Sequence, residues 1–142
     1  MPGKLVTKLS NRQCFTLTEK DTLKTASEKF KQHNVGVMPV LNEKNKTVIG
    51  IISERDLARY IHRGEFKSDL TVSKIMTKNI ISCNLNTSVT ELMEIISSHK
   101  IRHIPIIEDK KLLGIVSIGD VVNHIIEQYK DENQQLRDFI NQ

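Results

Sequence analysis

KIRHIPII (Lys100–Ile107) and GIVSIGD (Gly114–Asp120) together form the stretch of sequence that decides the fold. The order of residues predicts a strand, a turn, a second strand and the start of a helix. The same pattern occurs earlier in the chain, as VMPVL at Val37–Leu41 and GIISERD at Gly50–Asp56. The chain therefore carries this strand–turn–strand–helix unit twice.

Two spacings relate the two copies. Before the turn, Pro39 corresponds to Pro105, and we call this spacing the proline offset. After the turn, Ser53 corresponds to Ser117, and we call this slightly smaller spacing the serine offset. A turn that is two residues shorter in the second copy accounts for the difference. We interpret the chain as an internal duplication.

Length and composition favour a small intracellular protein. The chain has 142 residues, and a repeat of about 60 residues is at the low end for folding alone, so we expect the repeats to share one core. The net charge is +4 and aromatic residues make up 4%, with no Trp, so nucleic-acid binding is weakly supported. Cys14 and Cys83 form no CxxC pattern and are expected to be free thiols. No apolar run suits a signal peptide or a membrane span, and we expect a cytoplasmic location.

Local signals place the secondary structure of each repeat. Asp21 or Thr22 can cap a helix that ends near Asn34. Ser88 and Glu91 have the spacing of a capping box at the equivalent helix of the second repeat. The expected strands include residues 14–17, 37–41, 47–52 and 80–82, and the expected helices include residues 54–62 and 119–140.

The predicted fold class is α+β, with two β-α-β-β-α repeats packed about a pseudo-twofold axis and a long C-terminal helix. Two clefts are expected between the repeats. The apolar positions of the last helix, from Val121 to Ile140, continue past the repeat, so we expect them to form a dimer contact or to pack across the domain. The predicted boundaries are an N-terminal arm or short helix at 1–13, repeat 1 at 14–65, a linker and start of repeat 2 at 66–79, repeat 2 at 80–128 and a helical extension at 129–142.

Each copy contains Gly-Ile-x-Ser-x-x-Asp, which places Ser53 and Asp56, and again Ser117 and Asp120, at the start of a helix. One interpretation is a helix cap, in which the serine and the carboxylate satisfy backbone amides. The other is a ligand site, because a helix start suits a phosphate and a carboxylate accepts hydrogen bonds from both hydroxyls of a ribose. The recurrence of the motif favours a role in binding a nucleotide.

Arg102 and His103 precede the strand that contains Pro105. Beside Ser117 and Asp120 this pair would form a phosphate clamp. Repeat 1 has Gly36 and Val37 at the matching positions, so the two clefts are expected to be unequal. Arg55 or Lys74 would then supply positive charge to the other cleft.

Signatures of catalysis are missing from the sequence. It contains no nucleophile elbow, P-loop or HExxH motif, and no Cys/His cluster at metal-ligand spacing. We expect a protein that is not an enzyme and that holds no metal.

The combination of motifs resembles a tandem pair of cystathionine-β-synthase (CBS) domains, the Bateman module. The resemblance rests on Lys74–Thr77, on Ile101–Pro105 and on the two Gly-x-x-Ser-x-x-Asp segments, and it covers about residues 14–130. It is nearest to the small stand-alone bacterial CBS-pair proteins. It implies an adenosine-containing ligand such as AMP, ADP, ATP, NAD(H) or S-adenosylmethionine, a flat dimer, no catalytic cofactor, and regulation of a separate, unidentified protein.

The resemblance also assigns roles to residues of this chain. Asp120 would hold a ribose, with Ser117 and either Arg102 or His103 near the phosphate. In the second cleft Asp56 would hold the ribose, with Ser53 near the phosphate. Because Gly36 and Val37 carry no charge, the second cleft is left with three alternatives: a nucleoside part, the second half of a dinucleotide, or an empty site. The base would contact Cys14, Phe15, Val35 and Gly36 in the first cleft, and Thr77, Ile80 and Ile81 in the second.

Two other classes of function stay open at the sequence level. One is a structural or interaction dimer whose clefts are unused. The other is a sensor of S-adenosylmethionine in place of a nucleotide. The leading prediction is a regulatory sensor of adenine nucleotides.

Overall fold

The computed structural model describes residues 3–10 and 12–141. Its first half contains α1 (Lys4–Leu9), β1 (Leu17–Thr18), α2 (Leu23–His33), β2 (Val37–Leu41), β3 (Val48–Ser53) and α3 (Glu54–His62). Its second half contains the short 3-10 helix η1 (Val72–Lys74), α4 (Val89–His99), β4 (His103–Glu108), β5 (Lys111–Ser117) and α5 (Ile118–Ile140). The α+β class, the two repeats and the long last helix are confirmed.

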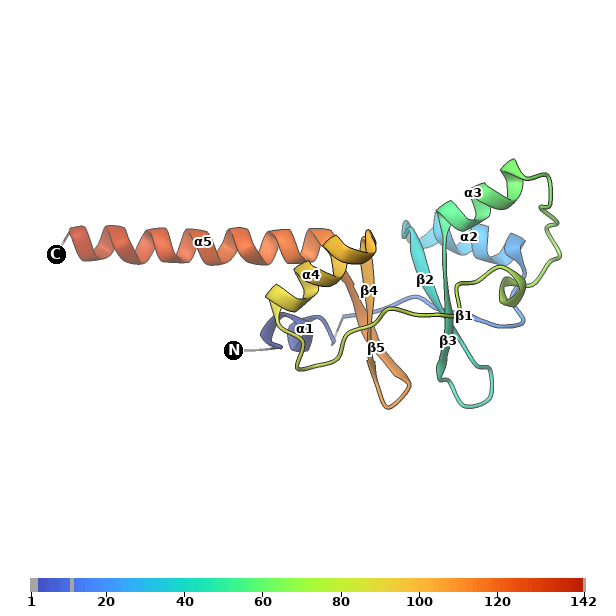
Figure 1. Cartoon of the computed structure of the whole chain (residues 1–142), viewed down its shortest axis with the longest axis horizontal. Helices are drawn as coiled ribbons and strands as arrows, with labels where there is room; N and C mark the ends of the chain where they lie inside the picture. Colours follow the sequence, from blue (N-terminus) through green and yellow to red (C-terminus); the bar gives the residue numbers. More distant parts are fainter. Residues whose placement is uncertain (1–2, 11, 142) are drawn as a thin grey trace.

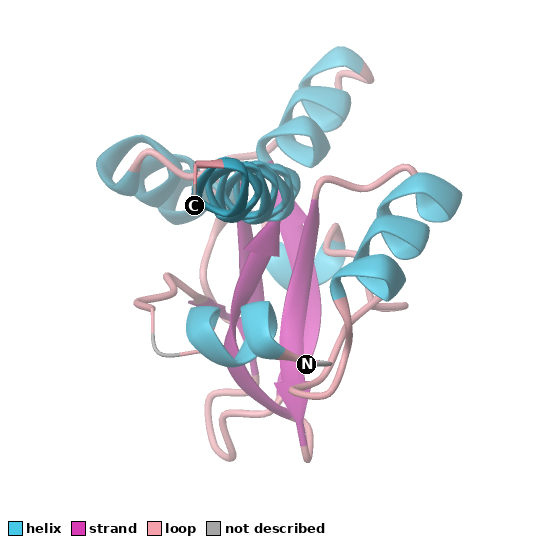
Figure 2. Cartoon of the chain, turned by 90° about the vertical axis from the view of Figure 1, so that its left-hand side faces the viewer, coloured by secondary structure: helices cyan, strands magenta, loops and turns pink. Residues whose placement is uncertain are grey.

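The strands form two small sheets that stand side by side. In the first sheet β1 pairs in parallel with β2, and β2 pairs antiparallel with β3; in the second, β4 and β5 form an antiparallel hairpin. A bridge between Thr47 and Lys111 joins the two sheets, and Val48 N donates to the carbonyl of Lys110. Helices α2 to α5 lie at one end of the upright strands and the hairpin turns lie at the other (Figure 1; Figure 2).

The first strand of each repeat is shorter than predicted. Residues 14–17 were expected to be a strand, but β1 begins only at Leu17. The strand expected at 80–82 is wrong, because the pairing in this segment is a single parallel bridge between Cys83 and Ile106. These apolar residues contribute their side chains to a cavity wall instead of extending the ladder, as described below.

Helix ends follow the local signals closely. Thr22 caps α2, its hydroxyl accepting from Thr25 N at 3.2 Å, and the helix ends at Asn34 in the left-handed conformation with φ 52°. Ser88 caps α4 by accepting from Glu91 N at 3.2 Å. A capping box requires two hydrogen bonds, and among the described residues only this one of the two forms.

The prediction of one shared core is wrong, because each repeat has a buried cluster of its own. Each cluster is completed by the segment that leads into the other repeat. Val6 and Leu9 of α1 are buried in the cluster of repeat 2, and their counterparts by the proline offset, Val72 and Ile75, are buried in the cluster of repeat 1. The two leading segments therefore cross over between the repeats.

Each crossing passes close to a glycine. A Cβ added to Gly50 would lie 2.3 Å from the sulfur of Met76, and one added to Gly114 would lie 3.0 Å from the carbonyl oxygen of Leu9. Gly50 and Gly114 are related by the serine offset and occupy the same position in β3 and β5. Their missing side chains leave room for the incoming chain, which explains why the sequence pattern begins with glycine.

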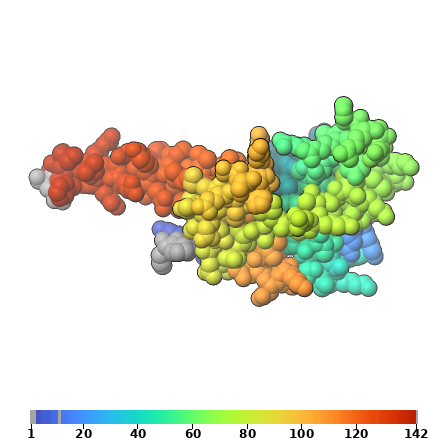
Figure 3. All heavy atoms as spheres, viewed as in Figure 1, coloured from blue at the N-terminus to red at the C-terminus, as the bar shows by residue number. Residues whose placement is uncertain are grey.

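Helix α5 extends well beyond the body of the molecule (Figure 1; Figure 3). It has 23 residues, which at about 1.5 Å per residue corresponds to a rod of roughly 35 Å. Among the described residues no helix is long and apolar enough to cross a membrane. Of the predicted apolar stripe, Val121 is buried, and the exposed members are Val122, Ile126, Tyr129, Leu136, Phe139 and Ile140.

Candidate functional site

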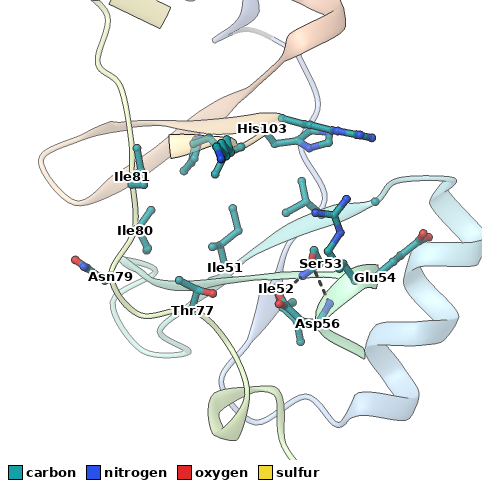
Figure 4. A pocket seen from close by; sticks show the side chains of 17 residues that line it. Ile51, Ile52, Ser53, Glu54, Asp56, Thr77, Asn79, Ile80, Ile81 and His103 are labelled. Atoms are coloured by element: carbon teal, nitrogen blue, oxygen red, sulfur yellow. Dashed lines mark hydrogen bonds between the residues drawn. The ribbon is translucent and has the colours of Figure 1, made fainter. Parts of the chain in front are cut away.

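Two cavities lie between the repeats. The larger has a volume of about 460 Å³ and contains the start of α3, with Ser53 and Asp56 (Figure 4). The smaller has a volume of about 290 Å³ and contains Ser117, at the start of α5. The two clefts expected from the duplication are therefore present.

The larger cavity combines parts of both repeats. Repeat 1 supplies the segment Ile51–Asp56, and repeat 2 supplies Lys100–His103 and Pro105. The third wall is the connecting segment, from which Thr77, Asn79, Ile80 and Ile81 face the cavity (Figure 4). Backbone bonds between Thr77 and Ile51, each at 2.9 Å, attach this wall to β3.

The smaller cavity is the symmetric counterpart of the larger one. The proline offset relates its lining residues Cys14 and Phe15 to Ile80 and Ile81, and it relates the segment 34–37 to the segment 100–103. The serine offset relates Ile51 and Ser53 of the larger cavity to Ile115 and Ser117 of the smaller one. The apolar residues predicted to line a base are thus distributed over the two cavities as expected, although their role in binding stays a prediction.

The two serine–aspartate pairs both form complete helix caps. Ser53 Oγ accepts from Asp56 N at 3.2 Å, and Asp56 Oδ2 accepts from Ser53 N at 2.8 Å. The pair Ser117 and Asp120 repeats these bonds at 3.1 and 2.8 Å. The capping interpretation is confirmed, and it uses one carboxylate oxygen of each aspartate, so it leaves the other oxygen for a further partner.

Of the two residues predicted as alternatives beside Ser117, His103 lines that cavity. Arg102 lines the cavity of Ser53 and Asp56 instead. Its carbonyl accepts from Ile118 N at 2.8 Å, which ties its backbone to the start of α5.

Positive charge is therefore concentrated in the larger cavity. Lys100, Arg102 and Arg55 all line the larger cavity. Of the two cations suggested for this cleft, Arg55 is present and Lys74 is not among the lining residues. Gly36 and Val37 line both cavities. Because the larger cavity has cations from other residues, the lack of charge at these two positions matters mainly in the smaller one.

His103 lies at the boundary and lines both cavities. Burial lowers its pKa below the ordinary value of 6.5, and Arg102 acts in the same direction, while Asp120 opposes both. The imidazole is therefore neutral near pH 7. A neutral ring between two cavities can donate to a ligand in either of them.

Asp120 is held by a residue that the sequence analysis did not single out. Arg12 Nη1 donates to Asp120 Oδ1 at 2.9 Å, and Arg12 Nη2 donates to Oδ2 at 2.8 Å. Burial raises the pKa of Asp120, but hydrogen bonds from Arg12 and Ser117 outweigh it and hold the pKa below 3.8. One signal was available: the proline offset relates Arg12 to Lys78, so a cation precedes the apolar wall in both repeats.

The thiols of the chain are free, as predicted. Cys14 lines the smaller cavity, and burial raises its pKa to about 11. Cys83 is buried in the core of repeat 2, where burial raises its pKa to about 12. Both are protonated at neutral pH and are poor nucleophiles.

Comparison with known families places this architecture. The profile of the CBS domain matches residues 6–63 and again residues 72–127. The mitochondrial CBS domain-containing protein CBSX3 of Arabidopsis thaliana is 37% identical over 127 residues, which are 87% of this chain and 62% of that protein. The chain thus spans less than two thirds of the length of this relative.

Solved structures agree with the sequence match. The CBS-domain protein ATU1752 of Agrobacterium tumefaciens superposes with a TM-score of 0.76 at 32% identity, covering 86% of this chain and 96% of that one. The CBS domain pair of MJ0100, solved with 5-methylthioadenosine and S-adenosyl-L-methionine, gives a TM-score of 0.77 at 22% identity, covering 88% and 98% of the two chains. The second likeness concerns the fold alone.

Proposed function

We propose that this chain, which belongs to the CBS-domain family, is a regulatory module that binds an adenine nucleotide between its two repeats. It acts by recognising the ligand and changing shape, and not by catalysis. The primary site is the larger cavity, and the smaller cavity is a second site of the same design.

The observation that carries the proposal is the open carboxylate of Asp56 in a cavity that three cations also line. Asp56 Oδ2 accepts from Ser53 N, and among the described residues Oδ1 has no hydrogen-bond partner. A carboxylate with a free oxygen accepts from the two hydroxyls of a ribose. Arg55, Lys100 and Arg102 line the same cavity and suit the phosphate that a nucleotide attaches to that ribose.

The remaining walls suit a purine. Ile51, Ile80, Ile81 and Ile101 give the larger cavity an apolar lining (Figure 4). Flat apolar rings gain most from such a lining, and a few polar groups then fix their orientation. Thr77 and Asn79, on the same wall, can supply those polar groups.

Charge favours a phosphorylated ligand over S-adenosylmethionine. That compound carries a positive sulfonium and no phosphate. The lining of the larger cavity, with three cations against the acids Glu54 and Asp56, is net positive and disfavours it. AMP, ADP, ATP and NAD(H) all carry negative charge on the ribose side. We therefore rank these nucleotides first, although the remote relative MJ0100 was solved with S-adenosyl-L-methionine.

The signal would pass to a separate protein. A ligand shifts a conformational equilibrium only when it binds one arrangement better than another. Contacts from both repeats to one ligand provide such a difference. We expect a homodimer through the exposed apolar positions of α5, including Leu136 and Phe139. A cytoplasmic location remains our prediction, and the related plant protein is a mitochondrial one.

One observation favours the alternative of a structural dimer with unused clefts. Both serine–aspartate motifs form complete helix caps, so their presence does not require a ligand. Under that alternative, neither the wild-type protein nor Asp56→Asn would respond to a ligand.

Thermal unfolding with a panel of ligands tests the proposal. AMP, ADP, ATP, NAD, NADH and S-adenosylmethionine are added separately to the wild-type protein and to Asp56→Asn, with the exposed Asp131→Asn as the matched control. At 100 times its dissociation constant a ligand adds about 2.7 kcal/mol of stability, which shifts the midpoint by several degrees. We expect a shift with a phosphorylated compound that Asp56→Asn loses and Asp131→Asn keeps. A flat response across the panel from a folded protein would leave the structural dimer.

A further inference from the structure

Arg12 makes three hydrogen bonds at the smaller cavity, which it also lines. Two of them form a bidentate pair with Asp120, at 2.9 and 2.8 Å. The third runs from Arg12 Nη2 to the carbonyl oxygen of Ile115, at 2.8 Å. A guanidinium in this geometry is fixed in direction as well as held by charge.

Counting acceptor positions shows what this pair does to Asp120. A carboxylate offers about four lone-pair positions. Arg12 takes one on Oδ1 and one on Oδ2, and Ser117 N takes a second on Oδ2. A ribose needs two acceptor positions for its neighbouring hydroxyls, so Asp120 cannot accept both while Arg12 is in place.

Asp56 differs, although its cap is the same. Lys78 stands at the position that the proline offset relates to Arg12, and it is exposed and does not line the larger cavity. The carbonyl of Ile51, which is equivalent to that of Ile115, accepts from the backbone of Thr77 at 2.9 Å instead. Thus the side chain of Arg12 fills a position in repeat 2 that has no charged counterpart in repeat 1.

The guanidinium of Arg12 is positioned by helix α1, which packs in the core of repeat 2. Arg12 N donates to the carbonyl of Leu9 at 3.1 Å, which ties it to the end of α1. Leu5, Val6 and Leu9 of that helix are buried in the core of repeat 2. A change at Asp120 is therefore transmitted directly to the N-terminal helix.

We propose that Arg12 is an internal occupant of the ribose position at Asp120, so that the smaller cavity admits a nucleotide only when the N-terminal segment releases this carboxylate. The two cavities then fill in order, the larger one first. Occupation of the second moves Arg12, whose backbone amide is bonded to the end of α1. Entry of a nucleotide rests on the proposed function, whereas the contact between Arg12 and Asp120 does not.

The affinity of the smaller cavity is reduced by the fraction of molecules in which Asp120 is free. A coupling of this kind typically changes affinity by roughly ten-fold or more. Replacing Arg12 by a residue that cannot form the bidentate pair should remove this penalty. The larger cavity should be unaffected because Arg12 does not line it.

Isothermal titration with AMP, and in parallel with ATP, measures the number of sites. We expect one site per chain in the wild type, lost in Asp56→Asn. We expect a second site in Arg12→Gln, which persists in the double variant Arg12→Gln/Asp56→Asn. The exposed Arg137→Gln, which changes the net charge equally, should behave as the wild type. Two equal sites in the wild type, or no second site in Arg12→Gln, would overturn the inference.

A measurement without ligand separates this inference from the proposed function. Thermal unfolding of Arg12→Gln, Asp120→Asn and the double variant forms a double-mutant cycle, and asparagine retains an oxygen for the cap. We expect the sum of the decreases in unfolding midpoint of the two single variants to exceed the decrease of the double variant. Additive losses would overturn the occupancy of Asp120 by Arg12. If no compound binds but the losses are non-additive, the proposed function fails and the internal contact stands.

Discussion

Asp56 and Asp120 accept the same backbone bond, from Ser53 N and Ser117 N, each at 2.8 Å. They differ in what holds the rest of the carboxylate, because Arg12 binds Asp120 and no described cation forms an ion pair with Asp56. Two copies of one motif thus give an open carboxylate that lines the larger cavity and an occupied one, bound by Arg12, that is not itself among the lining residues of the smaller cavity.

The serine caps predict a loss of stability without any ligand. Ser53→Ala and Ser117→Ala each remove the acceptor for an amide at a helix start, and each should lower the free energy of unfolding by about 1 kcal/mol. Denaturant unfolding measures this, with Ser27→Ala, an exposed serine in the middle of α2, as the control. Unchanged stability in both variants would contradict the capping role.

The close approach at Gly50 predicts a steric effect that a second substitution relieves. Gly50→Ala places a Cβ at 2.3 Å from the sulfur of Met76, and such overpacking costs about 1–3 kcal/mol. Gly50→Ala/Met76→Ala should be less destabilised than the sum of its single variants. Gly36→Ala is the control, because nothing lies within 4 Å of its added Cβ. Equal effects at Gly36 and Gly50 in denaturant unfolding would contradict the clash.

The lowered pKa of Asp120 predicts how stability depends on acid. A carboxyl whose pKa is lowered in the folded state contributes stability above its unfolded pKa and loses it as the pH falls through the folded pKa. The stability difference between the wild type and Asp120→Asn should therefore be constant near neutral pH and shrink once the pH falls below 3.8. Unfolding curves from pH 7 to pH 3 test this, and a difference that grows in acid would contradict it.

His103 predicts proton uptake on binding. Its pKa is lowered by burial and by Arg102, and a bound phosphate would raise it, so affinity should increase as the pH falls from about 7.5 toward 6. The phosphate itself titrates with a pKa of about 6, so the comparison is between the wild type and His103→Gln. The exposed His62→Gln serves as the control. Identical pH profiles in titration calorimetry for the wild type and His103→Gln would exclude this histidine from the effect.

The exposed stripe of α5 predicts self-association. Leu136 and Phe139 are 58% and 73% exposed, on a part of the helix that contacts nothing in the body of the molecule. We expect Leu136→Asp/Phe139→Asp to convert a dimer to a monomer in sedimentation velocity while the melting of the body persists. The neighbouring polar Gln135→Asp is the control. A wild-type protein that sediments as a monomer would remove this prediction together with the proposed homodimer.

Features set by local chemistry could be predicted from the sequence. Thr22 and Asn34 mark the ends of α2 because a hydroxyl cap and a left-handed asparagine act within one helical turn. The hairpins and the two helix starts followed from the repeated motif. The strand expected at 80–82 failed because apolar residues serve a ladder and a cavity wall equally well, and single-sequence patterns do not distinguish the two.

Features set by distant contacts could not be predicted in the same way. The sequence left open whether Arg102 or His103 lies beside Ser117, because both are near it in the chain. The structure has His103 in that cavity and Arg102 in the other one, since each cavity joins segments of opposite repeats. Arg12 and Asp120 are far apart in the chain, and no periodicity links them. The burial of Val6 could have been predicted, since the proline offset relates it to Val72. This requires extending the comparison of the two repeats to residues before residue 14.

The crossing of the two leading segments has a consequence for how the molecule can be divided. A cut between the repeats would leave each half with its own leading segment but without the leading segment that completes its core. Val6 and Val72 would then both lose their buried sites. Two copies of a single half could repair this by exchanging their leading segments. A half-length ancestor would on this geometry have been complete only as a reciprocal pair, and duplication within one chain would have made that exchange permanent.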